Sequence, residues 1–178
     1  MYLLRLIAGI AFAGLLIPVR AATGVVPALH GAPPATQILF RARVLPAGDP
    51  LLQGARIPAG PFGKMTATLK GPVHRIIVDL NVDAHGLVYE DTPDGAHHAK
   101  IEATLLAFDS EGKRVNYLDQ GFQVNLNSEK YPKIMADGLP IRLALDLPAG
   151  PASLRIAVHD LNAERAGSFE VPLPDAAR

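Results

Sequence analysis

Apolar side chains occupy every second position in one segment after another of this chain, and this period of two constrains the fold more than any other feature. The clearest run is residues 73–82, which place Ile76, Val78, Leu80 and Val82 on one face of an extended chain. Successive side chains of a β-strand point to opposite faces of a sheet, so each such run predicts a strand with one apolar face. Comparable runs occupy residues 37–45, 98–107, 114–126, 141–147, 153–160 and 169–173.

Proline and glycine, of which the chain has sixteen each, separate these runs. Proline lacks an amide donor and glycine costs backbone entropy, so this spacing leaves no room for long helices. A turn is predicted at residues 93–95, after a short strand over residues 86–91. One short helix is expected, with Asn127 or Ser128 as its N-cap and Gly138 at its end.

About seven to eight strands and one small helix predict an all-β fold, an antiparallel sandwich of two sheets. Gly121 is expected to mark a β-bulge within residues 114–126. Residues 45–63 are rich in proline and glycine and predict a surface loop with at most a short edge strand. In a later run, Arg155 and His159 fall on the face opposite the apolar side chains.

The first residues have the pattern of a secretory signal peptide, which we assign to residues 1–22. Arg5 precedes fourteen uncharged residues, 6–19, and small residues surround a cleavage point after Ala21 or Ala22. An uncleaved membrane anchor and a mis-set start codon are the alternatives. The apolar stretch is shorter than the roughly 20 residues that a membrane-spanning helix needs.

The rest of the chain divides into three parts. Residues 23–36 are rich in proline and predict a linker, residues 37–174 a single β-sandwich domain, and residues 175–178 a C-terminal tail. With a signal peptide, the expected location is the periplasm, the cell surface or the medium. If the leader stays uncut, it is the one part expected to contact the membrane.

Charge and cysteine content exclude several classes of function. The chain has 17 basic and 17 acidic residues, and the basic ones form no stripe, so nucleic acid is not an expected partner. It has no cysteine, which excludes disulfides, thiolate metal sites and a cysteine nucleophile.

The adjacent histidines His97 and His98 raise the question of a metal site. His74, His85 or His159 could supply further zinc ligands, because zinc needs three or four that converge. However, neighbouring residues of a strand face opposite sides of the sheet, so His97 and His98 cannot grip one ion together. We expect them to begin a strand, and we expect no metal or cofactor site.

Acidic residues and serines are the other candidates for chemistry. Glu90, Asp91 and Asp94 could bind calcium, but their spacing favours an ordinary turn. None of the serines lies in a Gly-x-Ser-x-Gly elbow or at a spacing that assigns it a histidine and an acid. The serines considered are Ser110, Ser128, Ser153 and Ser168. We therefore expect no catalytic residue.

Five stretches carry a resemblance to a known family: ATQILFRARVLPAGDP, GPVHRIIVDLNVD, YEDTPDGAHHAKIEATLLAFDSEGKRVN, LNSEKYPKIMADGLPIRLALDLPAG and LRIAVHDLNAERAGSFEVPL. Together they resemble the C-terminal region of acidobacterial von Willebrand factor A domain-related proteins, over about residues 29–173. The resemblance implies export and an immunoglobulin-like or fibronectin-like sandwich. The chain lacks the Asp-x-Ser-x-Ser metal loop of the A domain, so no metal ligand is carried over.

These observations favour binding over catalysis. Sandwich domains offer end loops and exposed strand edges, both suited to contact with an envelope protein. The chain has no tryptophan, so a sugar-stacking platform has weaker support than protein interaction. Tyr89, Tyr117 and Tyr131 are the aromatic candidates for contact. The expected function is an exported, non-catalytic interaction domain, with a glycan-binding domain or a metal-dependent hydrolase as alternatives.

Overall fold

The computed structural model describes residues 30–55, 72–150 and 153–173. The predicted signal peptide, residues 23–29 of the predicted linker, the second half of the loop over 45–63 and the C-terminal tail lie outside these residues. Among the described residues, no helix has the length and apolar character needed to cross a membrane.

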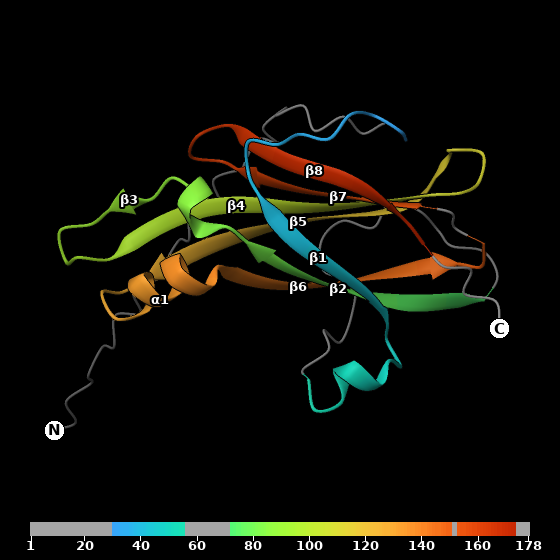
Figure 1. Ribbon diagram of the computed structural model, residues 1–178, viewed down its shortest axis with the longest axis horizontal. Helices are drawn as coiled ribbons and strands as arrows, with labels where there is room; N and C mark the ends of the chain where they lie inside the picture. Colours follow the sequence, from blue (N-terminus) through green and yellow to red (C-terminus); the bar gives the residue numbers. More distant parts are fainter. Residues whose placement is uncertain (1–29, 56–71, 151–152, 174–178) are drawn as a thin grey trace, which may run out of the picture.

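Eight strands, two 3-10 helices and one α-helix follow one another in the described chain (Figure 1). Their bounds are β1 (Phe40–Pro46), η1 (Pro50–Leu52), β2 (Val73–Val82), η2 (Ala84–Gly86), β3 (Glu90–Asp91), β4 (His97–Phe108), β5 (Arg114–Leu126), α1 (Lys130–Asp137), β6 (Leu139–Pro148), β7 (Ser153–Asp160) and β8 (Arg165–Pro172).

The strands form two antiparallel sheets. The smaller sheet has the order β1-β2-β6, and in the larger one β4 lies between β5 on one side and β3 and β7 on the other, with β8 beyond β7. Every pairing is antiparallel. The predicted all-β antiparallel sandwich with one short helix is confirmed.

The apolar faces of the two sheets meet in one core. Fully buried members of this core are Val78, Val82, Ile101, Leu105, Leu118, Leu154 and Ile156. Burying an aliphatic side chain of this size stabilises the fold by about 1.5–3 kcal/mol, so a chain without disulfides can fold on packing alone. Leu52 of η1 forms a second small cluster with Ile77 and Ala144 on the outer face of the smaller sheet.

The structure differs from the sequence prediction at two turns. The strand expected over residues 86–91 is shorter, because Asp83 accepts a hydrogen bond from the His85 amide at 3.1 Å and starts the 3-10 turn η2. Within these residues, only Glu90–Asp91 pair with another strand, as β3. The bulge expected at Gly121 is also wrong: the register shift lies where Ala107 pairs with Asn116 and Phe108 with Arg114, so Val115 is the extra residue.

The helix α1 begins after Asn127, whose side chain accepts a hydrogen bond from the Lys130 amide at 2.9 Å. It ends at Gly138, which has a φ of 85° and donates its amide to the Ile134 carbonyl at 2.9 Å. Glycine reaches this left-handed conformation without steric cost, so the expected end of the helix is confirmed.

Residues 30–37, which we call the N-terminal strap, lie against β7 and β8 (Figure 1). Thr36 bridges Gly167, and the Ser168 amide donates to the Ala35 carbonyl at 2.8 Å. The strap then passes over Arg155, which donates to its carbonyls and is fully buried. The polar face of β7 is therefore covered, whereas the polar faces of the other strands are at least partly exposed.

Candidate functional site

His97 and His98 are the first two residues of β4, as predicted, and their side chains do not form one site together. The His97 ring stacks on Tyr131 with centroids 3.7 Å apart, and its Nδ1 lies 2.6 Å from Oδ1 of Asp91. His98 follows on the opposite face, where its backbone pairs with Glu90. The two rings take different environments, as alternation requires.

Two of the three tyrosines proposed for contact come together beside His97. The rings of Tyr89 and Tyr131 meet edge to face at 5.3 Å, while Tyr117 lies elsewhere, under the guanidinium of Arg114 at 4.7 Å. The Tyr89 hydroxyl is buried and has no hydrogen-bond partner. Burial, with the nearby Tyr131 and Asp160, raises the pKa of Tyr89 to about 12. These rings pack on one another and present no open platform.

Replacing Tyr89 with phenylalanine is expected to leave the free energy of unfolding unchanged or to raise it by up to about 1 kcal/mol, because the buried hydroxyl gains nothing from the fold. Urea unfolding measures this. In the wild-type protein this tyrosine ionises first in the unfolded state, so its contribution to stability is lost as pH rises from 10 towards 12. Ultraviolet titration of Tyr89→Phe should lose the highest tyrosine transition, whereas Tyr117→Phe should keep it. A marked loss of stability in Tyr89→Phe would contradict this assignment.

The candidate metal ligands do not converge. In the three described stretches, no group of three or more histidine, aspartate and glutamate side chains could hold an ion. His85 pairs with Asp83 at 3.2 Å on η2, whereas His159 on β7 lies opposite Glu102. In the turn proposed for calcium, Asp91 contacts His97, and the carboxylate of Asp94 accepts the Thr92 hydroxyl.

A cross-strand pair on the larger sheet was not anticipated. Glu102 on β4 lies opposite His159 on β7, which is 4 % exposed and has an Nε2 without a hydrogen-bond partner. Burial, reinforced by Asp119, raises the pKa of Glu102, while His159 opposes the shift. The pair holds one acid and one imidazole, too few groups for an ion site.

Ser153, His30 and Glu170 form a trio that resembles a hydrolase triad in residue type only. Nδ1 of His30 lies 2.6 Å from Oε1 of Glu170 and 3.3 Å from Oγ of Ser153. In a triad the serine and the acid use different ring nitrogens: one nitrogen takes the proton of the serine hydroxyl, and the acid binds the other and orients the ring. Here both contact the same nitrogen, and the trio ties the N-terminal strap to β7 and β8. Its members are far apart in the sequence, and no spacing rule could have found them.

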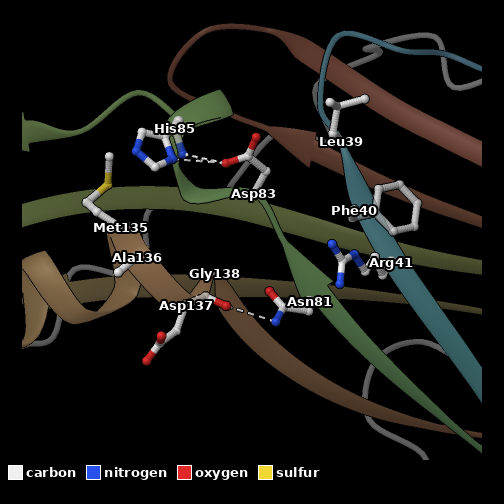
Figure 2. A pocket seen from close by; sticks show the side chains of 10 residues that line it. All are labelled: Leu39, Phe40, Arg41, Asn81, Asp83, His85, Met135, Ala136, Asp137 and Gly138. Carbon is white, nitrogen blue, oxygen red and sulfur yellow. Dashed lines mark hydrogen bonds and ion pairs between the residues drawn. The ribbon is translucent and has the colours of Figure 1, made fainter.

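A polar groove lies at the end of the smaller sheet (Figure 2). It has a volume of about 480 Å³ and is walled by the start of β1, the end of β2, η2 and the last turn of α1. Asn81 lines it and donates to the Asp137 carbonyl at 3.0 Å. Arg41, Asp83 and Asp137 line it with charges of both signs. The groove can hold a small polar molecule.

The other exposed feature at this end of the molecule is the outer edge of β1. The Asp83 amide donates to the Leu39 carbonyl, and the Ala47 amide to the Arg75 carbonyl, both at 2.9 Å. Backbone groups of an antiparallel strand alternate between its two edges, so the odd-numbered residues between these bonds face β2. The amides of Phe40, Ala42 and Val44 therefore point away from β2. No other strand of the described chain pairs with this edge.

Charged residues cross the outer face of the smaller sheet in register. Asp79 on β2 accepts two hydrogen bonds from Arg142 on β6, at 2.5 and 2.9 Å, and one from Arg43 on β1 at 2.9 Å. Hydrogen bonds from Arg142 and Arg43 lower the pKa of Asp79 despite its partial burial. A second row joins Arg75 and Asp146 at 2.6 and 2.9 Å. The first row ends at the free edge with a positive charge.

In comparisons with known proteins, no protein-family model, no curated protein and no solved structure matches this chain. The resemblance to von Willebrand factor A domain-related proteins therefore stays a prediction from the sequence. The candidate site rests on the geometry alone, and its strongest feature is the unpaired edge of β1.

Proposed function

We propose that the chain is an exported, non-catalytic interaction domain of the cell envelope, which binds another protein by adding a strand of the partner to β1. The observation that carries this proposal is the row of amides at Phe40, Ala42 and Val44, which point away from the sheet. An extended peptide satisfies such a row through main-chain hydrogen bonds. The signal-peptide pattern and the resemblance to exported accessory sandwiches support the location.

Site-specific crosslinking in cells that express the chain tests this function. A photo-reactive residue in place of the exposed Arg43, on the free edge, should form an adduct with a protein of the envelope fraction. The same residue in place of Lys100, exposed on β4 between β5 and β7, serves as the control and should not. Ala42→Pro should abolish the adduct, because proline removes one of the outward amides and the fold does not use that amide.

Two results would contradict strand addition. One is an adduct of equal yield in Ala42→Pro, provided that circular dichroism shows the variant folded. The other would come from hydrogen exchange of the free wild-type protein, which does not depend on any variant: amides of residues 40, 42 and 44 that exchange as slowly as those of Arg41 and Arg43.

A glycan-binding role is the second candidate, and the groove of Figure 2 favours it. Its volume suits one sugar unit, and Arg41, Asp83 and Asp137 could meet hydroxyl groups. Phe40, the one phenyl ring in its lining, stacks on Phe169 at 4.8 Å, which occupies one of its faces. Binding on a polysaccharide array that is lost in Asp137→Ala would favour this candidate over protein binding.

A further inference from the structure

We infer that the strand accepted by β1 is acidic, with carboxylates at alternate positions facing Arg41 and Arg43 and apolar residues between them. The inference rests on the strand addition proposed above and specifies its partner. It follows from three features of the edge: the charges on its outer face, the apolar side chains on its inner face, and the position of its one proline.

The outer face of the sheet already shows the pattern that an added strand would continue. Along one row the charges alternate from Arg142 on β6 to Asp79 on β2 to Arg43 on β1. Opposite residues of paired strands are about 5 Å apart at Cβ, so a strand beyond β1 would place a side chain directly against Arg43. Arg142 binds Asp79 through two hydrogen bonds, which leaves Arg43 the less neutralised of the two arginines.

Arg41 strengthens this preference. The residue opposite Arg41 on β2 is the neutral Asn81. In the described part of the chain, no ion pair involves Arg41. Asp83 and Asp137 line the same groove, but on η2 and α1. β1 itself has two arginines and no acidic residue. Two carboxylates two residues apart on a partner strand would meet both guanidinium groups.

The inner face of β1 indicates which residues should lie between the carboxylates of the partner strand. Phe40, Ala42 and Val44 are partly buried at the margin of the main core. Apolar side chains on the partner would cover what these leave exposed. Pro46 closes the edge, since it has no amide to donate, and limits the pairing to a short stretch.

A second copy of this chain does not fit the edge. If β1 pairs antiparallel with another β1 about Ala42, Arg41 of one copy lies opposite Arg43 of the other, and like charges in opposite positions are destabilising. The same arginines that attract an acidic strand thus prevent self-association, a common use of charge on free edges.

Three short peptides distinguish the possibilities, each capped at both ends and alternating valine with one polar residue. The polar residue is glutamate in the first, glutamine in the second and lysine in the third. Binding to the purified chain is followed by chemical-shift titration and by protection of the amides of residues 40, 42 and 44 from exchange. The affinity of the glutamate peptide should exceed that of the glutamine peptide by about fivefold or more, and the lysine peptide should bind most weakly.

The variant R41Q/R43Q should bring the glutamate and glutamine peptides to nearly equal affinity, whereas Lys100→Gln, an exposed cation on β4, should keep the difference. Equal protection of the edge amides by all three peptides would overturn the acidic preference and leave strand addition standing. If no peptide protects these amides, the proposed function itself fails. Binding of the glutamate peptide without protection would also count against strand addition, since it would show charge attraction alone.

Discussion

Replacing Gly167 with alanine should destabilise the protein by about 2–4 kcal/mol. A Cβ at this position of β8 would lie 1.9 Å from the carbonyl oxygen and 2.9 Å from the carbonyl carbon of Ile38. These are backbone atoms and cannot rotate away, so the chain that joins the strap to β1 must move. The strap would then lose hydrogen bonds such as that between the Gln37 amide and the Ala166 carbonyl, 3.0 Å long.

Gly121→Ala is the matched control. Gly121 also lies in a strand of the larger sheet, but a Cβ there meets no atom within 4 Å. Alanine restricts the unfolded chain, so this variant should be neutral or more stable by up to about 1 kcal/mol. Urea unfolding of both variants measures the difference. Hydrogen exchange of the Ser168 amide, which bonds to the strap, should become faster only in Gly167→Ala; equal behaviour of the two variants would refute the steric argument.

The extent of the strands was predictable where alternation was unbroken. Residues 73–82 have the same bounds in the sequence prediction and in β2, because one face packs in the main core while the other carries Arg75, Asp79 and Asn81, which are at least partly exposed. The same rule failed to locate the bulge, since the extra residue Val115 has no distinctive side chain, whereas Gly121 pairs regularly with Glu102. The type of a side chain predicts which face of the sheet it lies on. The position of a bulge depends instead on how many residues each strand has between turns.

The candidate site was only partly predictable for a related reason. Alternation predicts that Arg41 and Arg43 face outwards, but it does not show which edge of a strand is unpaired. That depends on strand order, and β1 becomes an edge because β6, distant in sequence, takes the other side of β2. Likewise, the proline-rich residues 30–36 show no periodicity, so their contact with Arg155 could not be foreseen.

Replacing Arg155 with methionine is expected to cost about 3 kcal/mol, since it removes a fully buried charged donor and the three hydrogen bonds that it makes. The guanidinium donates to the carbonyls of Ala32 and Pro33 at 2.7 and 2.8 Å and to the Ser168 hydroxyl at 3.1 Å. Its side chain is 0 % exposed, and Glu170 lies 3.9 Å away. Methionine fills much of the volume, so the loss would report the hydrogen bonds more than a cavity.

Arg43→Met makes the same chemical change at a side chain that is 54 % exposed, and Asp79 keeps its two bonds to Arg142 there. It should change the free energy of unfolding by less than about 1 kcal/mol. Urea unfolding compares the two, and limited proteolysis adds a local readout: cleavage before residue 38 should accelerate in Arg155→Met and not in Arg43→Met. If both variants lose the same stability, or if the strap stays protected without Arg155, then the buried guanidinium does not hold the strap. Its complete burial would in that case need another cause, because a charge removed from water at no gain lowers stability.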